Sequence, residues 1–490
     1  MWINDDVCYQ ALRARDHRFD GRFFVAVSST GVYCRPICPA RLPSRAHCRF
    51  FSSAAAAEAE GFRPCLRCRP ELAPGYASVD ACRRLAYQAA TRIEDGLPEG
   101  GLTGLARQLG VSDRHLRRTF ISEFGVSPVA YVQTRRLLLA KQLLTDTALP
   151  VTEVALAAGF GSQRRFNTLF RERYRLQPSE LRRLRGQKGG LDDCAMEFQL
   201  AYRPPLAWAA LRDFFAQRAI AGVEAVSDDQ YRRTVLVCRD GVEHRGWLTV
   251  APVKDRPALR LTLSASLAPV VATMLGRVRR MFDLSCQPQE VAEALGELAV
   301  AHPGLRVPGA FDGFETAVRA VLGQQITVRA ASTLAGRVAT ALGQPVETPF
   351  TDLSHTFPSA AVVAATEAEV LGKLGIVRSR VGAIQALARG CADGSLMLAP
   401  GVDVPATLKA LKALPGIGDW TAQYLAMRAL AWPDAFPAAD YGVLKALGES
   451  KSKQAQVRAE SWRPWRAYAV MHLWQSLADR APTENEDGHH

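Results

Sequence analysis

The chain has 490 residues, with 61 Lys and Arg against 48 Asp and Glu, so its formal net charge is +13. A hydrophobic content of 48% and a charged content of 22% are ordinary for a globular protein, and they exclude a disordered or collagen-like chain. The length predicts three or four domains of roughly 100–200 residues each.

The excess charge lies entirely in residues 1–190, which carry +13, whereas residues 191–490 are neutral. A basic region of this size favours a polyanionic partner, either nucleic acid or an acidic membrane surface. The sequence contains no run of about 18 apolar residues, so it predicts no membrane-spanning helix. The first residues also lack the pattern of a secretory signal. We therefore expect a cytoplasmic protein with no membrane partner.

Changes in composition divide the chain into five segments. Residues 1–77 are rich in Cys, Arg and aromatics, and residues 78–185 have the pattern of short amphipathic helices interrupted by Gly and Pro. A Gly-rich linker occupies 186–194. Residues 195–300 begin with alternating apolar and polar runs that predict antiparallel strands, and residues 301–482 have a helical pattern. The expected fold class is multidomain and mainly α, with an α+β C-terminal half.

The N-terminal cysteines form two close pairs. Seven of the eleven cysteines lie in the first 82 residues, which in a reducing compartment indicates metal binding rather than a disulfide framework. Three residues separate Cys34 from Cys38, two separate Cys65 from Cys68, and 26 lie between the pairs. This spacing can place four thiolates around one Zn²⁺. Arginines among the cysteines predict contacts with DNA phosphate, namely Arg35, Arg41, Arg63 and Arg67.

Two blocks around these cysteines resemble the N-terminal domain of the Ada family: GVYCRPIC at 31–38 and GFRPCLRCRPE at 61–71. The resemblance covers about residues 5–75 and implies that the four cysteines bind zinc. It also implies that Cys34 irreversibly accepts a methyl group from a methylated DNA phosphotriester. Methylation would lower the formal charge of a Zn(Cys)4 centre from −2 to −1, so it would weaken repulsion from DNA. The alternative is a purely structural zinc site.

Two helix-turn-helix patterns follow. The first turns at Gly110 and begins a second helix after Ser112; the second starts at Val151 and turns at Gly159. A single copy would be explained as a helical hairpin with a basic face, but two copies joined by a long helix favour DNA binding. The predicted recognition helices carry polar side chains for the major groove: Arg114, Arg117, Arg118, Gln163, Arg164, Arg165 and Asn167.

This segment resembles the AraC-type DNA-binding domain in the residues AAGF at 157–160, Phe166, Phe170-Arg171 and Gln177-Pro178. The Ada family carries the same module directly after its zinc domain. The resemblance implies a transcriptional activator that binds double-stranded promoter DNA, with RNA polymerase as a further partner. It implies no oligomer.

The C-terminal half contains the sequence LKALPGIGDWTAQY at 411–424, a helix, a hairpin and a second helix. Gly416 and Gly418 would expose backbone N–H groups at a helix N-terminus, which suits DNA phosphate. Asp440 follows about twenty residues later. Alone it would be the start of a helix, but together the hairpin and the aspartate resemble the helix-hairpin-helix DNA glycosylases. The similarity is to the AlkA type of 3-methyladenine glycosylase, over about residues 196–480.

The resemblance implies a role for each matching residue. Asp440 would be the catalytic carboxylate, and Trp420, Tyr424 and Trp474 would line the pocket for the flipped base; without the resemblance, such aromatics would be expected in a core. Gln325 would fill the space that the flipped base leaves in the duplex. The backbone carbonyls of Lys412, Leu414 and Ile417 would hold a monovalent cation, Na⁺ or K⁺.

The residue types suit the excision of alkylated purines. Such a base is cationic, so it is attracted to electron-rich aromatic faces and leaves without a strong acid, while Asp440 would stabilise the oxocarbenium-like sugar. Trp420 stands where bifunctional glycosylases carry a Schiff-base lysine, so we expect a monofunctional enzyme. No Pro-Cys-His-Arg motif is present, so we expect no second Ada methyltransferase domain.

We therefore expect a DNA alkylation repair protein in which an Ada-like zinc domain and an AraC-type domain are fused to an AlkA-like glycosylase. Its partners would be alkylated DNA and promoter DNA. The alternative is a transcriptional regulator whose C-terminal half grips DNA without catalysis.

Overall fold

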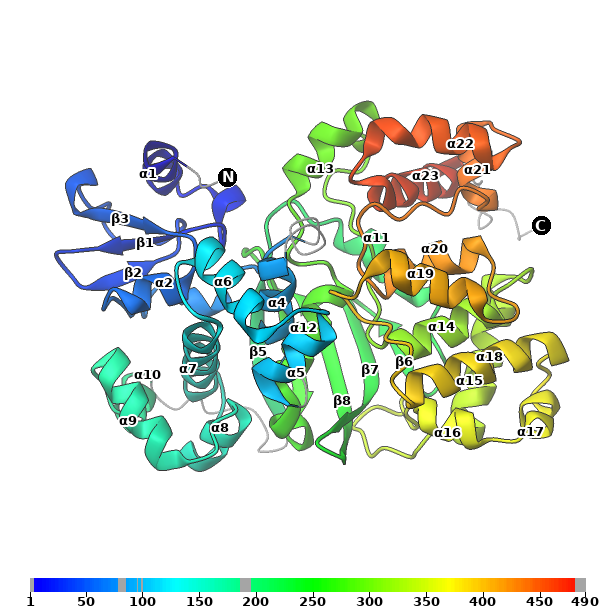
Figure 1. The fold of residues 1–490 in the computed structure, drawn as a ribbon, viewed down its shortest axis with the longest axis horizontal. Coiled ribbons are helices and arrows are strands. Elements are labelled where there is room, and N and C mark those ends of the chain that lie inside the picture. The colour runs from blue at the N-terminus through cyan, green and yellow to red at the C-terminus, as the bar shows by residue number, and fades with distance from the viewer. Residues whose placement is uncertain (1–3, 78–84, 95, 98–99, 186–194, 481–490) are drawn as a thin grey trace, which may run out of the picture.

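The computed structural model describes residues 4–77, 85–94, 96–97, 100–185 and 195–480, and the expected linker at 186–194 lies outside these ranges. In Figure 1 the N-terminal module and the helices of residues 128–185 lie to the left of a central sheet, and most helices after residue 313 lie to its right. The expected fold class, mainly α with a small cysteine-rich domain and an α+β C-terminal half, is confirmed.

The N-terminal module is a four-stranded sheet in the order β3-β1-β2-β4, packed with α1 (Asp5–Ala14) and α2 (Ala54–Ala59). Its strands are β1 (Phe24–Val27), β2 (Val32–Cys34), β3 (Cys48–Phe51) and β4 (Arg63–Pro64). Strands β2 and β4 are parallel neighbours. Because β2 ends at Cys34 and β4 ends directly before Cys65, this pairing brings the two cysteine pairs to the same edge.

The helix-turn-helix region consists of α4 (Leu85–Glu94), α5 (Gly101–Gln108), α6 (Asp113–Phe124), α7 (Pro128–Asp146), α8 (Val151–Ala157), α9 (Gln163–Tyr174) and α10 (Pro178–Arg185). The side chains of Ser112 and Ser162 accept hydrogen bonds from backbone N–H groups in the first turns of α6 and α9. Phe120 and Phe166 are fully buried on the inner faces of these helices. Their opposite faces are therefore left to solvent.

The second half begins with a five-stranded antiparallel sheet in the order β5-β9-β8-β7-β6. Its strands are β5 (Ala195–Ala201), β6 (Glu224–Ser227), β7 (Gln230–Arg239), β8 (Val242–Pro252) and β9 (Ala258–Ser264). The expectation of strands alone was incomplete, because α11 (Trp208–Ala216) interrupts them. Leu211, Phe214 and Phe215 are buried at helical spacing, and that periodicity overrides the strand pattern of the neighbouring segments.

Helices complete the chain: α12 (Val271–Met281), α13 (Pro288–Leu295), α14 (Gly313–Leu322), α15 (Val328–Leu342), α16 (Ala360–Ala365), α17 (Ala368–Lys373), α18 (Arg378–Ala392), α19 (Val404–Ala413), α20 (Asp419–Arg428), α21 (Tyr441–Leu447), α22 (Ser452–Ala459) and α23 (Arg466–Arg480). Helices α14 and α20 pack against each other, as do α21 and α23. This packing assembles the site described below.

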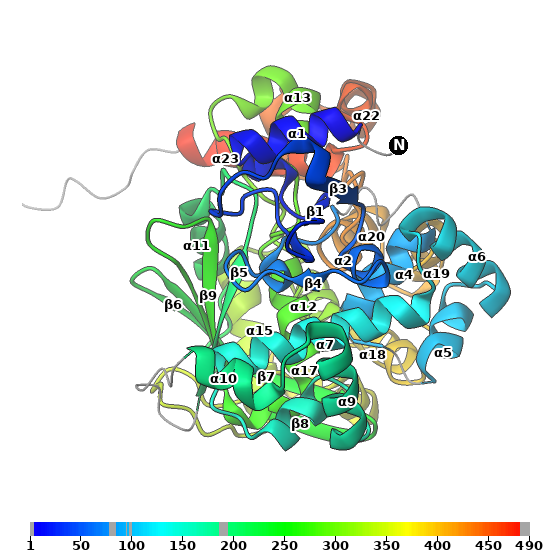
Figure 2. The same cartoon turned by 90° about the vertical axis from the view of Figure 1, so that its left-hand side faces the viewer.

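Buried polar contacts join the modules. Lys141 of α7 donates to both carboxylate oxygens of Glu71 at 2.6 Å, and Arg69 binds Asp146 at the end of the same helix. Figure 2 shows α7 beneath the N-terminal module. Arg203 donates to the carbonyls of Gly75 and Ser285, so one guanidinium bridges the N-terminal module and the second half.

Candidate functional sites: a cysteine cluster and a carboxylate between two indoles

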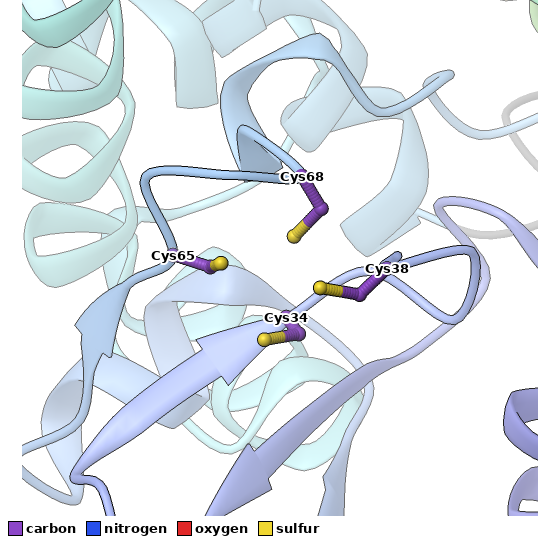
Figure 3. A group of neighbouring side chains, drawn as sticks. All are labelled: Cys34, Cys38, Cys65 and Cys68. Carbon is purple, nitrogen blue, oxygen red and sulfur yellow. The ribbon is translucent and has the colours of Figure 1, made fainter. Parts of the chain in front are cut away.

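The four predicted zinc ligands converge in space (Figure 3). The sulfur atoms of Cys34, Cys38, Cys65 and Cys68 all lie within 4.8 Å of one another. Four Zn–S bonds of about 2.3 Å in a tetrahedron require sulfur–sulfur separations of roughly 3.8 Å, so the cluster fits the ion. Among the described residues, this is the one group of His, Cys, Asp or Glu side chains arranged to hold a metal.

The four sulfurs differ in their hydrogen bonds and exposure. The backbone N–H of Arg35 donates to Cys68 Sγ at 3.3 Å, and that of Arg67 donates to Cys65 Sγ at 3.4 Å. The Cys38 thiol is also bonded by a backbone N–H, that of Ala40. In the described part of the chain, no backbone N–H reaches Cys34 Sγ, and Cys34 is the most exposed of the four at 9%. A thiolate without such donors keeps more electron density for nucleophilic attack.

One predicted phosphate contact is corrected by the structure. Arg35 is only 5% exposed, and its guanidinium forms an ion pair with Asp20 and donates to the Cys68 carbonyl. It therefore supports the cysteine cluster from inside and cannot reach DNA. Arg41 and Arg67 are exposed and Arg63 is half-buried, so these three side chains lie at or near the surface.

The predicted recognition helices present most of their polar residues outward. On α6, Arg114, Arg117 and Arg118 are exposed. On α9, Gln163, Arg164 and Arg165 are exposed, whereas Asn167 is half-buried and its Oδ1 atom has no hydrogen-bond partner.

Asp440 caps the N-terminus of α21, and both of its carboxylate oxygens are occupied. Oδ1 accepts from the Val443 N–H at 3.0 Å and from Trp474 Nε1 at 2.8 Å. Oδ2 accepts from Trp420 Nε1 at 2.9 Å. Two indoles from α20 and α23 thus clamp one carboxylate, although these residues are up to 54 positions apart in sequence. Asp440 is half-buried.

The aromatic residues predicted for the base pocket lie together. The rings of Trp420 and Tyr424 are stacked, with centroids 5.3 Å apart and an interplanar angle of 13°. Three residues that the sequence analysis missed lie behind Tyr424. Arg428 donates to its hydroxyl at 2.6 Å. Phe214 of α11 and Arg218, which follows that helix, line the same cavity as Tyr424. The i,i+4 spacing on α20 could have indicated Arg428. No local signal pointed to α11.

The hairpin between α19 and α20 lies next to Gln324 and Gln325. Gly416 has a left-handed φ of +77°, and Gly418 caps α20 with open space around its Cα. Gln324 Nε2 donates to the Gly416 carbonyl at 3.0 Å, while Gln325 is exposed. Lys412 lies in the last turn of α19, and Leu414 and Ile417 lie in the hairpin, where the Leu414 carbonyl accepts from the Ile417 N–H at 3.3 Å.

No helix in the described ranges is long and apolar enough to cross a bilayer. Four family profiles match the chain in sequence order: "Metal binding domain of Ada" at 7–71, "Helix-turn-helix domain" at 105–184, "AlkA N-terminal domain" at 197–312, and "HhH-GPD superfamily base excision DNA repair protein" at 318–467. The matches cover each region in which a site was found.

Curated relatives share this organisation in whole or in part. The "Probable bifunctional transcriptional activator/DNA repair enzyme AlkA" of Mycobacterium tuberculosis is 40% identical over 492 residues, which are 97% of either chain. The DNA-3-methyladenine glycosylase 2 of Escherichia coli is 40% identical over 278 residues, 56% of this chain and 96% of that one. The Ada protein of E. coli is 36% identical over 163 residues, 32% of this chain and 43% of that one. The chain belongs to the family of bifunctional transcriptional activator/DNA repair enzymes that join an Ada-type zinc domain and a helix-turn-helix domain to an AlkA-type glycosylase.

Proposed function

We propose that the protein is a monofunctional DNA glycosylase that hydrolyses the N-glycosidic bond of alkylated purines such as 3-methyladenine. Its N-terminal modules would sense DNA methyl phosphotriesters and activate transcription. The observation that carries the glycosylase assignment is the clamped carboxylate of Asp440 beside the stacked rings of Trp420 and Tyr424. The glycosylase relative from E. coli, named for 3-methyladenine, supports the choice of substrate.

The geometry supports the following sequence of events. A base flipped out of the duplex would stack on Trp420 and Tyr424, whose faces attract a cationic purine. As the bond from C1′ to the base nitrogen breaks, positive charge moves to the sugar, where the carboxylate of Asp440 stabilises it. A water then bonds to C1′ and loses its proton to Asp440 or to solvent. Because both oxygens of Asp440 are held by N–H donors, the carboxylate needs no reorientation during the reaction.

Gln325, the hairpin and the aromatic site would act on the same lesion. Gln325 lies at an exposed turn with φ +56°, a position suited to entering the space vacated by the base. Gly416 and Gly418 would let the start of α20 approach a phosphate. The carbonyls of Lys412, Leu414 and Ile417 would hold Na⁺ or K⁺ there; this part rests on the resemblance to helix-hairpin-helix glycosylases.

The second activity would take place at the cysteine cluster. Zinc keeps its thiolate ligands deprotonated at neutral pH. Cys34 Sγ would attack the methyl carbon of the phosphotriester, so that an S–C bond forms, the C–O bond breaks and the phosphate departs as a diester anion. The lack of a backbone N–H donor to Cys34 supports its choice over the other three cysteines. Arg41, Arg63 and Arg67 would contact the neighbouring phosphates.

The helix-turn-helix residues would bind promoter DNA. Arg114, Arg117, Arg118, Gln163, Arg164 and Arg165 are exposed on α6 and α9, and Asn167 is half-buried beside them. RNA polymerase would be the partner that converts promoter binding into activation. We further propose that the modules divide at 1–77, 78–185, 195–300 and 301–482, which is close to the ranges of the family matches. The DNA-directed modules and free thiols are suited to the cytoplasm.

A base-release assay on methylated DNA tests the catalytic assignment. Wild-type protein should release alkylated purines, and Asp440→Asn should lower the single-turnover rate by on the order of a hundredfold or more. Asp213→Asn, an exposed carboxylate on α11, serves as the matched control and should excise normally. Excision by Asp440→Asn at the wild-type rate would instead favour a C-terminal half that only grips DNA.

A further inference from the structure

A buried cluster of charges lies directly behind the base pocket. It contains the guanidiniums of Arg218, Arg233, Arg319 and Arg428 and the carboxylates of Glu224 and Glu315. Four positive charges therefore face two negative ones. Arg233 and Arg428 are 3% and 7% exposed, and Arg319 and Arg218 are partly buried. The excess of two positive charges is screened only weakly by water.

The two carboxylates form ion pairs with the two arginines that lie farther from Tyr424. Arg319 binds Glu224 at 2.7 Å and Glu315 at 3.1 Å, and Arg233 binds Glu315 at 2.6 Å. Arg218 and Arg428 have no such partner among the described side chains. Arg428 donates to the carbonyls of Pro308 and Gly309 and to the Tyr424 hydroxyl. The uncompensated charge is thus located on the pair next to Tyr424.

This pair lies at one end of a row of groups that ends at Asp440. The guanidinium of Arg428 touches the Tyr424 hydroxyl, the Tyr424 ring stacks on Trp420, and Trp420 Nε1 donates to Asp440. The guanidinium of Arg218 lies 3.8 Å from the centroid of the Phe214 ring, beside which Arg428 also packs at 4.7 Å. Positive charge therefore lies at the Tyr424 end of this row, and negative charge lies at the Trp420 end.

We propose that Arg218 and Arg428 create an electrostatic site for the departing purine, which drives positive charge from the base toward the sugar beside Asp440. This inference rests on the proposed glycosylase function. When the glycosidic bond breaks, its electron pair moves onto the base, whatever charge the base carried before. A positive potential behind the base stabilises that shift. The two arginines act across Tyr424 and Phe214, so they are positioning residues rather than catalytic ones.

The ionisation of neighbouring groups agrees with a positive potential at this place. Burial raises the pKa of Tyr424, but the guanidiniums of Arg428, Arg218 and Arg319 outweigh it, so the pKa lies below its ordinary value. Burial, together with Arg428 and Arg319, lowers the pKa of Arg218 to about 10, which leaves it charged at neutral pH.

The consequences differ for the two classes of purine. A cationic N-alkylpurine is repelled by the arginines while the glycosidic bond is intact, and this repulsion falls as the base loses its positive charge on leaving. The arginines would therefore accelerate the chemical step while weakening binding. An uncharged purine lesion becomes anionic as it leaves, so the arginines would accelerate its release with no cost in binding.

Single-turnover kinetics of full-length Arg218→Gln test the proposal, with DNA containing either 7-methylguanine or hypoxanthine. We expect the excision rate at saturating enzyme to fall on the order of tenfold for both lesions. The affinity for 7-methylguanine DNA should be unchanged or higher, which a merely structural loss would not produce. Arg218→Lys, which keeps the charge, should restore most of the rate. Arg212→Gln is the control and should behave as wild type, because Arg212 of α11 pairs with Asp213 instead of joining this cluster.

Two outcomes would overturn the proposal: Arg218→Gln at the wild-type rate, or equal losses of rate and affinity that Arg218→Lys does not restore. If wild-type protein excises neither lesion, the proposed function itself fails. Because Arg218→Gln could fail to fold, a second measurement uses the wild type. The near-ultraviolet absorbance of tyrosinate is measured against pH in the wild type and in Tyr424→Phe. The difference between the two proteins should show that Tyr424 ionises below the free-tyrosine pKa of about 10. Ionisation at or above that value also refutes the proposal.

Discussion

Trp474 Nε1 donates a hydrogen bond of 2.8 Å to Asp440 Oδ1, and Trp420 makes the equivalent bond to the other carboxylate oxygen. An aromatic side chain that would otherwise count as core packing therefore orients the carboxylate to which we assign catalysis. The bond also links α23 to the start of α21, so the position of the carboxylate is set by packing between helices.

Replacing Trp474 by Phe keeps an aromatic ring but removes the N–H donor. Because a hydrogen bond to a charged group contributes about 1.5–3 kcal/mol, we expect the single-turnover excision rate to fall by roughly ten- to a hundredfold. Single-turnover base release measures this. If the loss acts through Asp440, the double variant Trp474→Phe/Asp440→Asn should be no slower than Asp440→Asn alone. Additive losses would show that Trp474 acts independently of the carboxylate.

Cys34→Ser should separate the two activities. The variant should no longer gain the mass of one methylene group on the peptide containing residue 34 after incubation with methyl-phosphotriester DNA, as mass spectrometry would show. Base release should persist, since the groups around Asp440 come from α20, α21 and α23. Cys238→Ser, an exposed cysteine far along the chain, should leave both activities intact. Methyl transfer by Cys34→Ser would mean that another cysteine is the acceptor.

Glu58 makes the stability of the junction between the N-terminal module and α7 depend on pH. Its carboxylate accepts from Tyr33 at 3.0 Å and from Thr134 at 2.8 Å, and burial raises its pKa to about 7. Because the folded pKa exceeds the unfolded value of about 4.5, the folded state binds the proton more tightly. The stability contributed by this group is fully present below about pH 4.5 and is lost as the pH rises toward 7.

Urea denaturation between pH 5.5 and 8 can measure this effect in Glu58→Gln. Relative to wild type, the variant should gain stability as the pH rises, by up to about 3 kcal/mol over the full titration. Glu60→Gln is the control, because Glu60 pairs with Arg49 at the surface and should show no such trend. A stability difference for Glu58→Gln that is constant across this range would contradict the assignment.

The two hairpin glycines should respond differently to alanine. Gly416 has φ +77°, and an added Cβ would lie 3.1 Å from Ala383 Cβ, so Gly416→Ala should cost on the order of 1 kcal/mol of stability. An added Cβ at Gly418 meets no atom within 4 Å, so Gly418→Ala should keep the melting temperature.

Gly418→Ala should nevertheless weaken DNA binding several-fold, because its methyl group would stand between the first N–H groups of α20 and a phosphate. Fluorescence anisotropy with duplex DNA measures this affinity. Unchanged affinity in a fully folded Gly418→Ala protein would rule out a phosphate at this helix end.

The sequence alone identified the residues whose spacing is local. The two cysteine pairs, the serine caps of α6 and α9 and the Gly-rich hairpin are each encoded within a few positions, so motif and capping chemistry were sufficient to predict them. Asp440 was recognised through its fixed distance from the hairpin. The helix α11 was missed because its short apolar pattern lies between true strands, where only packing decides between the two periodicities.

Tertiary structure decided which of these side chains act together and which do not. Arg35 follows the predicted acceptor Cys34 in sequence. The fold nevertheless places Asp20 against the Arg35 guanidinium and buries this ion pair away from the protein surface. Phe214 of α11 and the nearby Arg218 line one cavity with Tyr424, about two hundred residues later in the chain, which no local pattern encodes. The sequence by itself determined the chemistry available to this protein. The arrangement of charges at the site, with arginines behind Tyr424 and a carboxylate held between two indoles, depends on long-range packing, since burial and partners determine the effect of each charge.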